Sequence, residues 1–290
     1  MPAPTFDLQS HSVASDGALE PAEVVARAHA AGVELLALTD HDTVAGVDEA
    51  LEVAAATNGE ITVVPAVEIS AVDGEREDLH VLGYGIDHHS PAFTAHLAAW
   101  RGDRLARGNR MADAMRELGW HVELPERAAD SEKPLGRPHL ALAIYDDPRN
   151  SQRIEEENLG DFSELLVAYL IPGTPGYRRR TIPNVGEAIA AIHEAGGLAV
   201  WAHPFWDIDA PGEVREALER YAALELDGVE AFYPTHDAAH AALLAEEAAG
   251  LGLLTTGSAD FHGPEHPQFS EFRAFDLHGL DPNLGSIDPR

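Results

Sequence analysis

Phe6-Asp7-Leu8-Gln9-Ser10-His11-Ser12-Val13-Ala14-Ser15-Asp16-Gly17 is the stretch that decides the fold. Its start favours a β-strand over residues 5–9, and polar residues follow at once. Gln9, His11 and Asp16 bring oxygen and nitrogen atoms of the kind that bind metal ions. The stretch therefore predicts a strand that is followed by the first residues of a metal site.

The same pattern, an apolar strand followed by His, Asp or Glu, recurs along the chain. Further strands are expected over residues 34–39, 61–67, 78–86, 198–202, 228–232 and 253–256. Helices are expected over residues 21–31, 44–57, 185–195, 214–223 and 238–249. This alternation of strands and helices predicts a parallel sheet or barrel of the α/β class.

Side chains suited to metal binding or acid–base chemistry stand at the carboxyl ends of the expected strands. In a parallel barrel these ends converge on one face. The group comprises Gln9, His11, Asp16, Asp40, His41, Glu68, His80, His203, Asp260 and His262. Five histidines with several carboxylates predict a polynuclear site for Mn, Fe or Zn. In Asp260-x-His262, the alternation of an extended chain is expected to send both side chains the same way.

The pattern becomes mostly helical between residues 91 and 182, with helices expected over 93–118, 138–145, 151–157 and 162–169. We therefore predict a first barrel part (1–90), a helical insertion (91–182) and a second barrel part with a C-terminal tail (183–290). Thirteen of the nineteen Lys and Arg residues fall in the insertion. This uneven placement of positive charge indicates that the insertion meets an anion.

Composition narrows the class of function. A formal net charge of −31 disfavours partners such as long duplex nucleic acid and anionic membranes. The absence of cysteine excludes thiolate metal sites and cysteine nucleophiles. No apolar segment approaches the ~20 residues of a membrane span, and no signal peptide is visible. A cytoplasmic location is expected.

The motifs resemble those of the polymerase and histidinol phosphatase (PHP) family of metal-dependent phosphoesterases. The resemblance covers residues 6–86 and 182–263. It rests on the opening stretch and on Leu38-Thr39-Asp40-His41-Asp42-Thr43, Glu68-Ile69, His80-Val81-Leu82-Gly83-Tyr84, Ala202-His203-Pro204 and Ser258-Ala259-Asp260-Phe261-His262-Gly263. It implies a distorted (β/α)7 barrel that holds two to three divalent metal ions (Mn, Fe or Zn).

The resemblance also implies a ligand set for each ion. One site would use Gln9, His11, Glu68 and Asp260. A second would use Glu68, His80 and His203, and a third Asp16, His41 and His262.

The long insertion resembles the branch that contains nucleoside 3′,5′-bisphosphate phosphatases and related 5′-nucleases, in which an insert caps the site. Gly136-Arg137-Pro138-His139 and Glu230-Ala231-Phe232-Tyr233-Pro234-Thr235-His236 also match this branch. The match implies that Arg137, His139 and His236 bind substrate, with Arg137 and His236 on its phosphate. Asp40 would take part in catalysis by supporting the side chains that bind the metal ions, without binding a metal ion itself. The expected reaction is hydrolysis of a nucleotide-like phosphomonoester by metal-bound hydroxide.

One departure from the family pattern is Gln9, because the family usually has His-x-His in this motif. An amide oxygen binds a metal ion more weakly than imidazole, so we expect one ion to exchange more easily than the others. Three alternatives stay open: a 5′→3′ exonuclease on short oligonucleotides, a phosphatase resembling histidinol phosphatase, and a non-catalytic metal-binding module.

Two further motifs have simple structural interpretations. Asp42 is expected to cap the helix that follows it. His88-His89 is expected to be exposed, because adjacent residues on a loop rarely bind one metal ion together.

Overall fold

The computed structural model describes residues 4–124, 136–180 and 182–289. The chain divides into two compact units. The barrel unit comprises Met1–Leu97 and Pro183–Arg290, and the helical unit comprises Ala98–Ile182. Arg127 and Lys133, two of the thirteen basic residues of the predicted insertion, lie outside the described residues.

The barrel unit contains one seven-stranded sheet in which every strand lies beside its neighbours in the sequence. The strands are β1 (Phe6–Asp7), β2 (Leu35–Leu38), β3 (Thr62–Asp73), β4 (Arg76–Tyr84), β5 (Leu198–Trp201), β6 (Gly228–Phe232) and β7 (Leu254–Gly257). The segments after β1 and β7 meet in a bridge between Ser10 and Phe261, and the Leu8 N–H donates to the Gly257 carbonyl. The sheet is therefore a nearly closed barrel, which confirms the predicted fold class.

One strand runs against the predicted direction. β4 pairs antiparallel with both β3 and β5, whereas the other neighbours pair in parallel. Only Gly74 and Glu75 separate β3 from β4, and Gly74 has a left-handed φ of 60°. So short a connection closes a hairpin and cannot cross over to a parallel strand. The expectation of strictly parallel strands was therefore wrong at β4.

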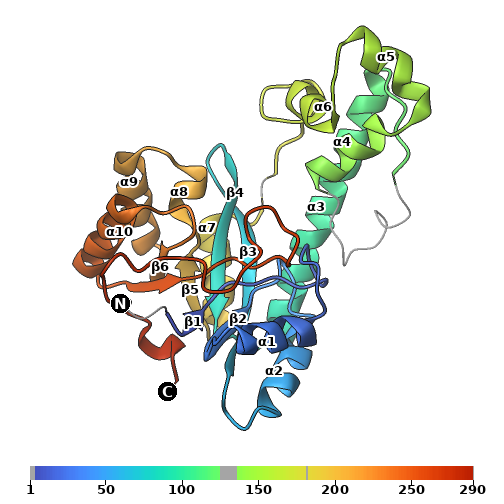
Figure 1. Cartoon of the computed structure of the whole chain (residues 1–290). Coiled ribbons are helices and arrows are strands. Elements are labelled where there is room, and N and C mark those ends of the chain that lie inside the picture. Colours follow the sequence, from blue (N-terminus) through green and yellow to red (C-terminus); the bar gives the residue numbers. More distant parts are fainter. Residues whose placement is uncertain (1–3, 125–135, 181, 290) are drawn as a thin grey trace. The chain divides into compact units, whose positions relative to one another are not determined.

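Helices cover the outside of the strands (Figure 1). They are α1 (Pro21–Ala30), α2 (Val47–Ala55), α7 (Val185–Glu194), α8 (Pro204–Asp207), α9 (Pro211–Ala222) and α10 (Ala238–Leu251). Apolar side chains of α1 and α2 pack with those of β2 and β3 in one core, which includes Val24, Ala28, Leu36, Ala50 and Val63. The sequence pattern predicted all of these helices except the short α8.

Local sequence explains where several helices begin and end. The Asn184 side chain accepts a hydrogen bond from the Glu187 N–H, and the Glu187 carboxylate accepts one from the Asn184 N–H, so α7 begins with a capping box. The residue before α10 is Asp237, whose carboxylate accepts two backbone N–H groups and caps the helix. The residue after it is Gly252, which is left-handed with a φ of 73°, as glycine readily allows.

The helical unit has a core of its own. α3 (Pro91–Glu117) continues into it from the barrel unit and is followed by α4 (Arg137–Tyr145), α5 (Ser151–Glu156) and α6 (Phe162–Tyr169). Buried side chains of these helices form one cluster, which includes Met111, Met115, Leu140, Ile144 and Leu165. The role of this unit as a cap over the site stays a prediction. Among the described residues, no helix has the length and apolar character needed to cross a membrane.

Candidate metal centre

The loop after β1 is held by one buried carboxylate, that of Asp40. Asp40 Oδ1 accepts hydrogen bonds from the Ser12 N–H at 2.8 Å and the Ser15 hydroxyl at 2.7 Å, and Oδ2 accepts the Ser12 hydroxyl at 2.7 Å. These bonds fix the turn that leads to Asp16. We therefore assign Asp40 a positioning role toward the loop.

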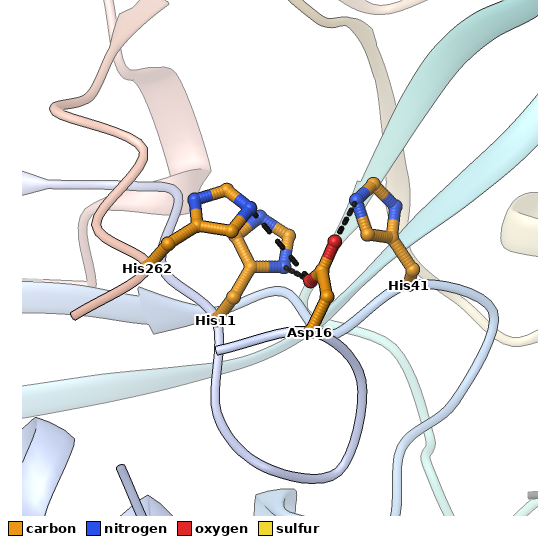
Figure 2. Close-up of side chains that lie close together, drawn as sticks. All are labelled: His11, Asp16, His41 and His262. Carbon is orange, nitrogen blue, oxygen red and sulfur yellow. Dashed lines mark ion pairs between the residues drawn. The ribbon is translucent and has the colours of Figure 1, made fainter. Parts of the chain in front are cut away.

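Asp16 stands between imidazoles from three segments of the chain (Figure 2). Its Oδ1 lies 3.7 Å from His11 Nδ1 and 3.7 Å from His262 Nε2, and its Oδ2 lies 3.6 Å from His41 Nε2. Burial raises the pKa of Asp16, but the positive charge that His41, His11 and His262 can carry outweighs it and leaves the pKa far below its usual range. This group of four side chains can hold one cation.

Glu68 lies at the middle of a second and larger group. Its Oε2 is 3.1 Å from His11 Nε2, which is itself 3.0 Å from Asp260 Oδ1. Its Oε1 is 2.7 Å from His80 Nδ1 and 3.3 Å from His203 Nε2, and those two nitrogens lie 3.3 Å apart. Both oxygens of Glu68 therefore face imidazole nitrogens, as a carboxylate that bridges two ions would require.

The polar atoms of this centre are buried without ordinary hydrogen-bond partners. Within the described residues, well-aligned hydrogen bonds are lacking for both nitrogens of His11, Glu68 Oε2, Asp260 Oδ1, His41 Nδ1 and His203 Nδ1. Buried polar atoms normally have partners, and separations of about 3 Å suit donor atoms that share one ion. Burial raises the pKa of Glu68, but the imidazoles around it outweigh this and hold the pKa well below its usual value. The residues present therefore fit divalent metal ions.

Comparison with known proteins agrees with this geometry. The PHP domain family matches residues 7–268. The chain belongs to this family. A 3′,5′-nucleoside bisphosphate phosphatase of Chromobacterium violaceum is 34% identical over 262 residues, which cover 89% of this chain and 87% of that protein. A 5′-3′ exoribonuclease of Haemophilus influenzae is 33% identical over 259 residues, which cover 89% and 90% of the two chains.

Solved structures of related proteins share the fold. An amidohydrolase from Chromobacterium violaceum, with bound sulfate and no metal, superposes with a TM-score of 0.73 and 32% identity over 93% of this chain and 91% of that chain. A putative metal-dependent phosphoesterase from Bifidobacterium adolescentis gives a TM-score of 0.70 and 28% identity over 92% and 91%. The predicted PHP resemblance is confirmed.

Two PHP motif residues adopt a backbone conformation that the sequence did not predict. Asp260 has a φ of 53° and His203 a φ of 26°, which is the region that non-glycine residues rarely occupy. Asp260 and His262 therefore do not converge through the alternation of an extended chain, and that expectation was wrong. β5 ends at Trp201 and β7 at Gly257, so both ligand candidates stand beyond their strands. Such strain is typical of functional sites.

Two expectations about position were also wrong. Glu68 lies within β3, which continues to Asp73, and His80 lies within β4, so neither stands at a strand end. Asp42 does not cap α2, whose N-cap is Gly46. The Asp42 carboxylate instead accepts hydrogen bonds from the Ser70 N–H at 2.9 Å and the Ser70 hydroxyl at 3.3 Å. These bonds connect the segment that carries His41 to the strand that carries Glu68.

Tyr233 and Glu230 support the centre in ways that sequence reasoning missed. The Tyr233 hydroxyl donates to Asp260 Oδ2 at 2.8 Å. The Glu230 carboxylate accepts the His203 N–H at 2.9 Å and the Ser258 hydroxyl at 2.6 Å. Both residues lie in the motif from Glu230 to His236, in which only His236 had received a role. The signal was present, because Glu230 lies within the strand expected over residues 228–232 and Tyr233 directly follows it.

Gln9 is fully buried and precedes His11 by two residues in the loop after β1. Its Oε1 is 3.4 Å from the Ser258 hydroxyl, and its Nε2 has no hydrogen-bond partner among the described residues. A buried amide with so few partners is available to a metal ion. Its role as a ligand stays a prediction, as do the roles of the other eight residues predicted to bind metal.

The predicted substrate residues lie in both units. Arg137 is half-buried and His139 exposed at the start of α4 in the helical unit, and their roles stay predictions. His236 is buried in the barrel unit, and its Nδ1 lies 3.0 Å from the Ala231 carbonyl. Burial lowers the pKa of His236 to about 4, so the ring is neutral at pH 7 with its proton on Nδ1. A phosphate contact through Nε2 would require a second proton, which burial disfavours.

Proposed function

We propose that this PHP-family chain hydrolyses a phosphomonoester of a nucleotide-like substrate, such as a nucleoside 3′,5′-bisphosphate. The observation that carries the proposal is the Glu68 group, in which the imidazoles of His11, His41, His80 and His203 surround the Glu68 carboxylate. Relatives over nine-tenths of the chain are named as phosphatase, exoribonuclease and phosphodiesterase. Phosphoester hydrolysis is the chemistry that these names share.

We propose that two to three divalent ions (Mn, Fe or Zn) bind here. His11, Glu68 and Asp260, with Gln9, would hold one ion, and Glu68, His80 and His203 a second. Asp16, His41 and His262 would hold a third. Bound metal ions supply the Lewis acidity that makes water nucleophilic near neutral pH and offset charge on phosphoryl oxygens.

The chain's own residues then position the reaction. Asp40 holds the turn that presents Asp16, and Tyr233 holds the Asp260 carboxylate with Oδ1 toward His11. We propose that Arg137 contacts the substrate phosphate, because its planar guanidinium can bond two phosphoryl oxygens at once. We propose that His139 also contacts the substrate, and that His236 does so as a neutral ring, since burial disfavours the second proton that a phosphate contact through Nε2 would need.

Aromatic side chains beside the centre favour a nucleotide over a small amino-alcohol phosphate. Trp206 is 50% exposed, and its ring centroid lies 6.5 Å from that of the ligand candidate His203 and 5.7 Å from that of Phe269. Phe269 in turn lies 5.6 Å from His262. An exposed indole next to a phosphate-hydrolysing site is suited to stacking a nucleobase. Histidinol phosphate offers a smaller ring and is the weaker candidate.

A 5′→3′ exonuclease is the second candidate, because several relatives are named as exoribonucleases. The net charge of −31 opposes long nucleic acid and is compatible with short oligonucleotides that reach the metal centre. The two functions differ in the length of the substrate and in whether phosphate or a nucleotide is released.

A phosphate-release assay with Mn²⁺ tests these assignments. Nucleoside 3′,5′-bisphosphates should turn over faster than nucleoside monophosphates, short oligonucleotides or histidinol phosphate. Asp260→Asn should reduce turnover to background while circular dichroism and the thermal midpoint stay close to wild type. Unchanged turnover in that variant would overturn the metal assignment. Absence of turnover on every phosphoester, with metal bound, would identify a non-catalytic metal-binding module.

A further inference from the structure

Three donor atoms converge at a place outside the PHP centre. His88 Nε2 lies 2.9 Å and His89 Nε2 3.2 Å from the same oxygen, Asp48 Oδ1. Asp48 stands in the first turn of α2, and the two histidines form the turn between β4 and α3. All three belong to the barrel unit.

The turn is fixed by hydrogen bonds that do not involve the two imidazoles. Asp87 Oδ1 accepts the His89 N–H at 3.1 Å, and the Asp87 carbonyl accepts the Ser90 N–H at 3.0 Å. The Asp87 N–H donates to the Ala195 carbonyl at 2.8 Å. This backbone holds the two rings on one side, 4.1 Å apart and tilted by 38°.

The fixed turn overcomes the usual obstacle to metal binding by adjacent residues, whose side chains normally diverge. His88 is also less exposed than expected, at 12% of its side chain, whereas His89 is 68% exposed. The expectation that both are simply exposed was therefore wrong for His88. One possible ligand atom from each of His88, His89 and Asp48 lies within 4.8 Å of the other two.

An ion pair alone does not account well for this arrangement. Asp48 is 63% exposed, and an exposed ion pair contributes little to stability. Two imidazole nitrogens that lie within 3.2 Å of one carboxylate oxygen instead form the donor set that borderline divalent ions prefer.

We propose that Asp48, His88 and His89 form a separate binding site for Zn²⁺ or a similar ion such as Ni²⁺ or Co²⁺. Water would complete the coordination, since the site is open to solvent. The bound ion would join the first turn of α2 to the turn before α3, and so would stabilise the barrel unit without taking part in hydrolysis. The site does not depend on the proposed function.

Zinc stoichiometry of the full chain tests the site. Equilibrium dialysis with Zn²⁺ followed by metal analysis should give one equivalent less for Asp48→Asn and for His88→Gln/His89→Gln than for wild type. The matched control is His29→Gln, because His29 Nε2 also lies beside a carboxylate, 3.2 Å from Glu60 Oε2, and no three-residue group among the described residues includes it. This control should keep the wild-type stoichiometry.

Two further readouts separate this site from the PHP centre. Phosphoesterase activity with Mn²⁺ should be the same in wild type and in His88→Gln/His89→Gln, whereas added Zn²⁺ should raise the thermal midpoint of wild type more than that of the variant. The single variant His89→Gln changes an exposed position and should fold normally. Its affinity for the extra zinc ion should be at least tenfold lower than that of wild type. Equal zinc content in wild type and all the site variants would overturn the proposal, and so would a midpoint shift independent of His88 and His89.

Discussion

The hydroxyl of Tyr233 offers a test of how the PHP centre is positioned. Tyr233→Phe removes only the oxygen that donates to Asp260 Oδ2 at 2.8 Å, and the ring stays in its buried place. A hydrogen bond to a charged group contributes about 1.5–3 kcal/mol. At about 1.4 kcal/mol per tenfold change, the loss corresponds to a factor of roughly 10 to 150. Changes in residues that orient metal ligands typically cost about 10–100-fold in metal affinity or activity, so two separate arguments give the same range.

The assay measures Mn²⁺ affinity by titration and kcat/KM on a nucleoside 3′,5′-bisphosphate. Tyr221→Phe is the matched control, because Tyr221 is also buried and its hydroxyl donates to a carboxylate, Asp73 Oδ2, at 2.7 Å. Asp73 belongs to none of the candidate metal groups of the described residues. Tyr221→Phe should lower the free energy of unfolding about as much as Tyr233→Phe does, because each variant loses one hydrogen bond to a carboxylate. It should leave Mn²⁺ affinity unchanged. If Tyr233→Phe kept both wild-type Mn²⁺ affinity and wild-type kcat/KM, the positioning argument would be refuted.

Three other predictions concern Gln9, Trp206 and His236. Dialysis against a chelator should remove one metal equivalent faster than the others, and Gln9→His should slow that loss; three ions held equally tightly by wild type would contradict the weak-ligand argument. Trp206→Ala should raise KM at least fivefold for a nucleoside bisphosphate, from base stacking worth ~1 kcal/mol or more, without effect on glycerol phosphate; equal changes for both substrates would count against a base-stacking role. His236 has a pKa lowered from 6.5 to about 4 by burial, so the unfolded chain binds more protons between these values and His236 makes the fold less stable as pH falls through this window. His236→Asn should therefore reduce the stability lost between pH 7 and pH 5 by about 2 kcal/mol in urea unfolding, and an identical loss in both proteins would show that His236 does not titrate in this way.

The sequence could predict which residues gather at the centre, because local patterns report strand ends. His11, His41, His203 and His262 each follow an apolar run, and the barrel then brings the ends of these runs together. The hairpin of β3 and β4 was less visible, because the two strands were expected over residues 61–67 and 78–86, too far apart for a tight turn, whereas β3 continues to Asp73 and β4 begins at Arg76. Gly74 after Asp73 was the available signal, since Asp-Gly pairs are typical of hairpin turns.

Contacts between distant segments could not be predicted in the same way. The bonds from Ser12 and Ser15 to Asp40, and from Tyr233 to Asp260, join residues 25 to 28 positions apart. No periodicity encodes such pairs, because they depend on where the barrel places each loop. The left-handed backbone of Asp260 could not be predicted either, since this position does not carry the glycine that usually marks a positive φ.

The surroundings of Gln9 explain how a glutamine can occupy a position where imidazole is usual in the family. The Ser258 hydroxyl has one hydrogen and faces two acceptors, Glu230 Oε1 at 2.6 Å and Gln9 Oε1 at 3.4 Å. The shorter contact is the stronger hydrogen bond, so Ser258 donates to Glu230 and, among the residues that the structure describes, leaves the amide oxygen of Gln9 without a strong donor. A buried oxygen in that state gains more from a metal ion than one already hydrogen-bonded. Ser258 and Glu230 therefore leave the amide oxygen of Gln9 available for the metal contact that we propose, although an amide oxygen is a weaker ligand than imidazole.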